Sequence, residues 1–210
     1  GLGERGGFLA ARALVRVLEE PRPLQFSSGV SADARVVAIG ALSTMEETLP
    51  VQHLIGLLED QGPIVRARAA VALRMTTNHR FLPEGTEWDV ASEDIRSEAL
   101  AAWRAWFTAW RRAPREEWLA MGFRARGFDV ARSMGARDVW VLCRAISDLD
   151  HVSYNAQRAL MRLAKREPAS LSWSKEDASF YWRRWFERRY KRFGAPPIPP
   201  ELSTLTAAPY

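Results

Sequence analysis

The stretch from Asp60 to Leu73, DQGPIVRARAAVAL, decides the fold class of this 210-residue chain. Asp60-Gln61-Gly62 is a turn sequence. Pro63 follows at the start of a helix, where proline is tolerated because the first N–H groups have no partner within the helix. The apolar positions of the helix recur on one face, at Val65, Ala69, Ala72 and Leu73. The small alanines allow this face to pack closely on a neighbouring helix.

The same pattern occurs elsewhere in the chain. A shift of 31 residues places Arg35-x-x-Ala38-x-x-Ala41-Leu42 on Arg66-x-x-Ala69-x-x-Ala72-Leu73. A shift of 87 residues places Val65, Ala69, Ala72 and Leu73 on Val152, Ala156, Ala159 and Leu160. One pair of short helices cannot bury its own apolar faces, so repeated pairs of this kind are expected to stack into a solenoid.

A second repeated element is aromatic. Trp103-Arg104-x-Trp106-Phe107 recurs as Trp182-Arg183-x-Trp185-Phe186, in a chain with nine tryptophans. Both pentads lie in predicted long helices, 93–112 after the N-cap candidate Ser92 and 175–193 after Ser174. The tryptophans follow helical spacing, so we expect them to form core and not a ligand surface.

These patterns resemble a HEAT repeat. The resemblance covers about 31–76 and 137–165, and the Trp-Arg-x-Trp-Phe helices at about 88–112 and 173–190 resemble an extension of bacterial HEAT-like proteins. It implies an all-α α-solenoid of stacked antiparallel helix pairs over 1–193, in two related halves at about 31–112 and 114–193. It also implies a scaffold or adaptor that binds other proteins.

The rest of the composition narrows the class of protein. Uninterrupted apolar runs reach only five residues, as from Val139 to Cys143, far short of the ~20 residues that span a bilayer. No signal peptide is recognisable, which favours the cytoplasm, although a chain that begins Gly-Leu-Gly resembles an excised domain. Arginine outnumbers lysine 27 to 3, as in a GC-rich bacterium. Residues 194–210 hold five prolines and are expected to be a disordered tail or a linker.

No group of residues indicates catalysis, a cofactor or a metal. Gly1-x-Gly3-x-x-Gly6 lacks the preceding strand that a dinucleotide site needs. His53, His79 and His151 are far apart in sequence, and Asp148-x-Asp150-His151 lies where a turn is expected. The single cysteine, Cys143, falls on an apolar stripe and excludes an internal disulfide. We therefore expect a protein that is not an enzyme.

Two surfaces are candidates for binding. The analogy with solenoid concavities selects the predicted inner helix, around Arg66, Arg68, Arg74 and the turn near Asp60, as the face for a protein partner.

The other candidate is the last helix. Residues 1–92 carry a net charge of −2 and residues 93–210 a net charge of +7. Within helix 175–193, a basic stripe forms at Arg184, Arg188 and Arg192. This helix either caps the solenoid, binds nucleic acid through phosphate contacts and stacking as in a HEAT-like DNA glycosylase fold, or lies on an anionic membrane surface.

Overall fold

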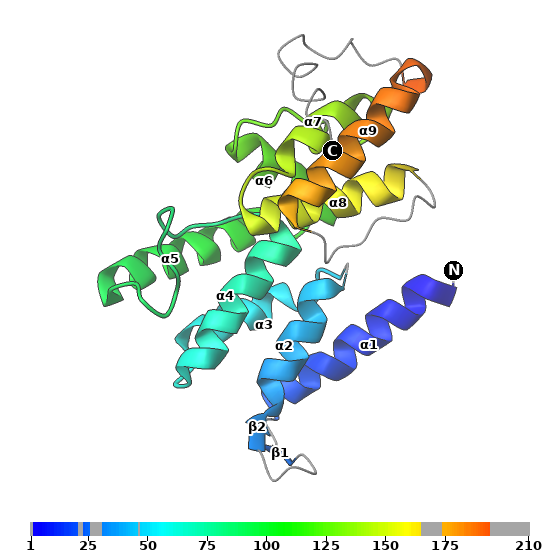
Figure 1. The fold of residues 1–210 in the computed structure, drawn as a ribbon. Helices are drawn as coiled ribbons and strands as arrows, with labels where there is room; N and C mark the ends of the chain where they lie inside the picture. The colour runs from blue at the N-terminus through cyan, green and yellow to red at the C-terminus, as the bar shows by residue number, and fades with distance from the viewer. Residues whose placement is uncertain (1, 21–22, 26–30, 46, 165–173, 194–210) are drawn as a thin grey trace. The chain divides into compact units, whose positions relative to one another are not determined.

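The computed structural model describes residues 2–20, 23–25, 31–45, 47–164 and 174–193. These residues form nine α-helices, so the predicted all-α class is confirmed (Figure 1). The chain divides into two compact units, residues 1–122 and 123–210. This division falls within α6 (Arg115–Ala125). Among the described helices, none combines the length and the apolar character needed to cross a membrane.

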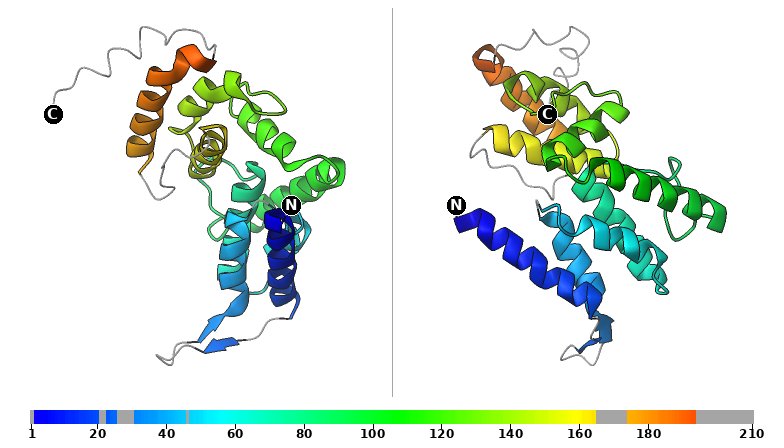
Figure 2. Two further views of the ribbon diagram at one scale, coloured as in Figure 1. Left: turned by 90° about the vertical axis from the view of Figure 1, so that its right-hand side faces the viewer. Right: turned by 180° about the vertical axis from the view of Figure 1, so that it is seen from behind.

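The first helix pair consists of α1 (Leu2–Glu19) and α2 (Ala34–Thr44), which run in opposite directions (Figures 1 and 2). Between them, β1 (Pro23–Gln25) and β2 (Ser31–Asp33) pair antiparallel with Leu24 opposite Ala32, a pairing that the sequence analysis did not predict. The sequence predicts Ser31, before the apolar residues Val37, Ile39 and Leu42, as the cap of this helix. The cap is instead Asp33, and Ser31 is paired within β2. The Asp33 carboxylate accepts a hydrogen bond from the Arg35 amide at 2.9 Å.

The second helix pair consists of α3 (Val51–Gly56), extended by the 3₁₀ turn η1 (Leu57–Glu59), and α4 (Pro63–Thr77). Pro63 occupies the first turn of α4 as predicted. The predicted apolar face is confirmed, since all of its members are at most 2% exposed, namely Val65, Ala69, Ala72 and Leu73. Helices α2 and α4 pack side by side and run in the same direction (Figure 1).

An aromatic core follows in the same unit, formed largely by α5 (Glu93–Trp110) and α6 (Arg115–Ala125). Trp103 and Trp106 are 2% and 8% exposed, and their rings meet edge-on with centroids 5.8 Å apart. The Trp106 ring in turn packs on the Trp118 ring, with a centroid distance of 5.2 Å. The predicted core role of the first tryptophan pentad is therefore confirmed, as is Ser92, whose hydroxyl accepts a hydrogen bond from the Ile95 amide.

Helix α4 ends against α6 at a very close approach. Asn78 ends α4 in the left-handed conformation, with φ of 64°, and its Nδ2 donates to the Leu119 carbonyl at 3.2 Å. On the next turn of α6 stands Gly122, where a Cβ atom would lie 2.2 Å from the Asn78 carbonyl oxygen. Only glycine permits this contact.

The second unit contains η2 (Ala136–Asp138), α7 (Val139–Ala145), α8 (Asp150–Ala164) and α9 (Lys175–Phe193). Each of the helices α7, α8 and α9 packs on the other two. Trp182, Trp185 and Phe186 are at most 1% exposed, so the second pentad also forms core. Ser174 caps α9 by accepting from the Asp177 amide at 3.1 Å. The predicted tail, 194–210, lies outside the described residues.

Replacing Gly122 tests the close approach of α4 and α6. Gly122→Ala is expected to lower the free energy of unfolding by about 2 kcal/mol or more, because the added methyl overlaps the Asn78 carbonyl. Gly56→Ala is the matched control. A Cβ at Gly56 meets nothing within 4 Å, and its φ of −60° is helical, so that variant should gain up to about 1 kcal/mol. Urea unfolding measures both, and equal effects would contradict the described contact.

Candidate functional site

The turn before α4 is organised by the Asp60 side chain. Its Oδ1 accepts a hydrogen bond from the Gly62 amide at 2.8 Å, which closes the turn between η1 and α4. The Arg66 guanidinium, one turn into α4, donates to the Asp60 and Gln61 carbonyl oxygens at 2.7 and 3.0 Å. These contacts satisfy backbone groups that the turn would otherwise leave unpaired.

The same carboxylate joins the two helix pairs. Its Oδ2 accepts a hydrogen bond from Nη1 of Arg35, at the start of α2. Arg35 also donates to Asp33 through Nε at 3.1 Å and Nη2 at 2.7 Å. The side chains of Arg35 and Asp60 are only 18% and 14% exposed. One guanidinium thus lies between the N-cap of α2 and the turn that precedes α4.

This placement shifts the acid–base equilibria of the arginine and of its neighbour. Hydrogen bonding to Arg35 holds the pKa of the Asp33 carboxyl below its usual value, against the opposing effect of burial. Hydrogen bonds to Asp33, and to a lesser extent Asp60, raise the pKa of Arg35. Asp33 and Arg35 are therefore both ionised near neutral pH.

The three arginines predicted on this helix have different environments. Arg66 is engaged with the turn carbonyls. Arg74 pairs with Glu87 at 2.8 Å, and Arg80 reaches the same carboxylate at 3.3 Å. Both arginines hold the pKa of Glu87 below its usual range. Arg68 is exposed and, within the described residues, its guanidinium has no hydrogen-bond or ion-pair partner. Of the three, only Arg68 has its full side chain available to a partner.

The solvent side of α2 and α4 is unusually apolar. In the alignment that shifts the chain by 31 residues, Val37 of α2 is equivalent to Arg68 of α4, and Gly40 is equivalent to Val71. Because the two helices pack side by side and run in the same direction, equivalent exposed positions are expected to face the same side of the pair. We call it the α2–α4 face, and its members are Val37, Gly40, Thr44, Ile64, Arg68 and Val71. Val37 and Ile64 are 52% and 65% exposed.

Charge is almost absent from this surface. All the exposed residues of α2 are uncharged, and Arg68 is the only charged residue among the exposed positions of α4. By contrast, four of the five exposed residues described in α9 are charged. In a chain with 26% charged residues, such a surface is atypical of a helix that faces only water.

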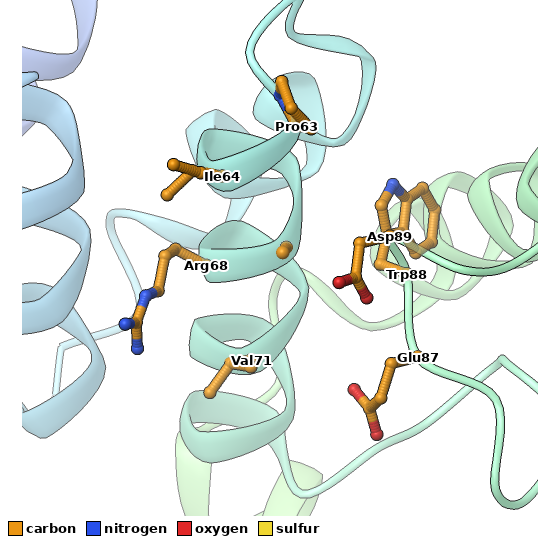
Figure 3. Close-up of a pocket in the computed structure, with 8 residues that line it drawn as sticks. Pro63, Ile64, Arg68, Val71, Glu87, Trp88 and Asp89 are labelled. Atoms are coloured by element: carbon orange, nitrogen blue, oxygen red, sulfur yellow. The ribbon is translucent and has the colours of Figure 1, made fainter.

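A groove of about 370 Å³ runs along α4 beside this face. Figure 3 shows Ile64, Arg68 and Val71 leaving one side of the helix, with the segment 87–89 on its other side. Ala67 contributes only a methyl group to the lining. The buried Trp88 ring and the exposed Asp89 carboxylate line the opposite wall. The groove is therefore lined by aliphatic side chains and the Trp88 ring, with Arg68 on one side and the carboxylates of Glu87 and Asp89 on the other.

Sequence reasoning found Arg68 but missed the aliphatic residues around it. The signal was present, because Ile64 and Val71 lie at i−4 and i+3 from Arg68, on the side of the helix opposite the alanines. Apolar residues on a face that should be polar were the available clue.

The basic stripe predicted on α9 is described in part. Arg184 and Arg188 are exposed, whereas the Arg192 side chain lies outside the described part of the chain. The Arg184 guanidinium lies over the Phe180 ring, 5.4 Å from its centroid, and Phe180 is 61% exposed. The structure thus adds an exposed aromatic ring to the predicted stripe.

The candidate titratable groups lie apart from this face. Burial lowers the pKa of His79 to about 4, opposed by a hydrogen bond to the Trp118 backbone. Its ring stacks on Phe81 and packs on Trp106, at centroid distances of 6.0 and 4.8 Å. Cys143 is fully buried, and burial raises the pKa of its thiol. Among the described residues, no three His, Cys, Asp or Glu side chains gather in a way that could hold a metal ion.

Comparison with known proteins gives no relative. Neither protein-family models, nor curated proteins, nor solved structures match this chain.

A double-mutant cycle tests the link between the helix pairs. Arg35→Met and Asp60→Asn are expected to show a coupling energy of about 1–2 kcal/mol in urea unfolding, because both charged groups are largely buried and hydrogen-bonded. The pair Arg104–Glu59 is the matched control. Its side chains are 56% and 53% exposed, so their coupling should stay below about 0.5 kcal/mol. Equal coupling in both pairs would contradict the bridging role of Arg35.

Acid should destabilise the protein through His79. The unfolded chain binds a proton at this histidine below about pH 6.5, whereas the folded chain resists it down to about pH 4. The free energy of unfolding should therefore fall between these values as the pH is lowered, by up to about 3 kcal/mol.

The pH dependence of the free energy of unfolding is measured in His79→Gln and in the control variant His53→Gln. His53 is a third exposed and lies 3.5 Å from Glu19. The His79 variant should lose most of the pH dependence between pH 6.5 and 4, and the His53 variant should retain it. An unchanged slope in His79→Gln would show that other groups titrate in this range.

Proposed function

We propose that this protein is a non-enzymatic scaffold or adaptor that binds a protein partner through the α2–α4 face. In this proposal, the antiparallel pairs α1–α2 and α3–α4 are successive units of a solenoid similar to HEAT-like repeats. The α2–α4 face is the solvent-exposed surface of their second helices. The observation that carries the proposal is the exposure of Val37, Ile64 and Val71 on a surface with a single charge. Exposed apolar surface of this kind is typical of interaction sites.

The arrangement of the helices supports the solenoid part of the proposal. The repeated residues Arg35 and Arg66 both contact Asp60, one through its carboxylate and one through its carbonyl oxygen. The second helices of successive pairs lie side by side and parallel. A stack of this kind holds its second helices in a fixed register, which suits the recognition of a folded or helical partner.

Nucleic acid binding through α9 is the second candidate. It is favoured by the exposed Phe180 ring next to Arg184, since an aromatic ring with a neighbouring cation can stack a base and contact a phosphate. Against it, the acidic side chains of Glu176 and Asp177 are exposed on the same helix. We place it below the protein-binding proposal for that reason.

The direct test is affinity capture from a lysate of the native host at about 100 mM salt, with and without nuclease, because phosphate contacts weaken steeply as salt rises. The wild type is compared with Ile64→Asp, which places a charge on the α2–α4 face, and with Phe180→Asp, which places one on α9. A stoichiometric protein partner that survives nuclease and is lost in Ile64→Asp alone is the expected result.

Two outcomes would overturn the proposal. Capture that is unchanged in Ile64→Asp would remove the α2–α4 face from consideration. Co-purified nucleic acid that disappears in Phe180→Asp, with proteins lost after nuclease, would establish the second candidate instead. Thermal unfolding followed by circular dichroism verifies that both variants fold like the wild type.

A further inference from the structure

We infer that the α2–α4 face binds one amphipathic α-helix of its partner, with a carboxylate of that helix paired to Arg68. This inference rests on the proposed function, because it specifies the partner of the same face.

The shape of the face favours a helix. Its ridges are the aliphatic side chains of Ile64 and Val71, and the adjoining groove is lined by the small side chain of Ala67. A Cβ atom at Gly40 would meet nothing within 4 Å, so the surface of α2 is open beside it. Small residues let the backbone of a docking helix approach closely, and aliphatic ridges pack between its side chains.

The length of the face fits a short helix. Ile64 and Val71 are seven residues apart in α4, which corresponds to about 10 Å or two helical turns. A partner helix therefore needs apolar side chains at positions i, i+3 or i+4, and i+7 to cover this stretch. An extended peptide would instead gain from a free sheet edge, and the described surface of α2 and α4 is entirely helical.

The charges select the chemistry of the partner. Arg68 stands among the aliphatic residues without an ion-pair partner in the described chain, so an apolar partner would leave this cation uncompensated as it excludes water. A glutamate or aspartate on the flank of the partner helix removes that penalty. On the other wall, Glu87 is already held by Arg74 and Arg80, and among the described residues no ion pair or hydrogen bond joins Asp89 to Arg68.

The probe for this inference is a phage-displayed library of random 16-residue peptides. The library is first depleted on the Ile64→Asp variant and then selected on the wild-type chain. Enriched peptides are expected to be amphipathic as helices, with Leu, Ile, Val or Met on one face and an acidic residue at its edge. Their helicity should rise on binding, as measured by circular dichroism.

Charge exchange gives the decisive readout. For an enriched peptide, Arg68→Glu should weaken binding about tenfold in fluorescence anisotropy, and replacing the peptide's acidic residue by lysine should restore it. Arg112→Glu, at an exposed arginine just beyond α5, is the matched control and should leave binding unchanged.

Enriched peptides that are proline-rich or basic, or a selection that recovers nothing above the Ile64→Asp background, would overturn the helix inference. Binding that ignores Arg68→Glu would overturn the charge assignment. The scaffold proposal fails separately, if capture from the lysate does not depend on Ile64.

Discussion

The carboxylate of Asp60 is the contact on which the arrangement of the first unit depends. It closes the turn before α4 through the Gly62 amide and binds the Arg35 guanidinium of the preceding helix pair. Because Arg35 is also held by the N-cap residue Asp33, the starts of α2 and α4 are fixed to each other. Alanines along the buried side of α4 then allow close packing, and these two constraints set the register of the helix pairs.

That register has a consequence for the surface. When α2 and α4 lie side by side and run in the same direction, the exposed positions of both helices face the same side of the pair, so Val37 adds to the apolar side chains of Ile64 and Val71. The arginines near it are mostly committed to structure, Arg66 to the turn and Arg74 to Glu87. Arg68 is left as the single charge on the face. The proposed partner helix follows from this combination of apolar area and one available cation.

The sequence predicts the core of this fold better than its surface. Helix starts at Pro63 and Ser92 and the buried tryptophans could be predicted, because proline, capping residues and apolar periodicity act over a few residues. The Gly122 contact could not, because it depends on Asn78, a residue distant in sequence. The β1–β2 pairing could not either, because strands of three residues are too short to show an apolar alternation. The same limit applies to the site. Arg68 was a candidate, but its difference from Arg66 depends on which carbonyl groups a guanidinium can reach in the folded chain.

The most direct measurement is hydrogen–deuterium exchange of the protein alone and in complex with its captured partner. If the α2–α4 face is the binding surface, amides in residues 34–44 and 63–77 should exchange more slowly in the complex, while those of α9 stay unchanged. Slower exchange confined to residues 175–193 would contradict the account and assign binding to the basic helix instead.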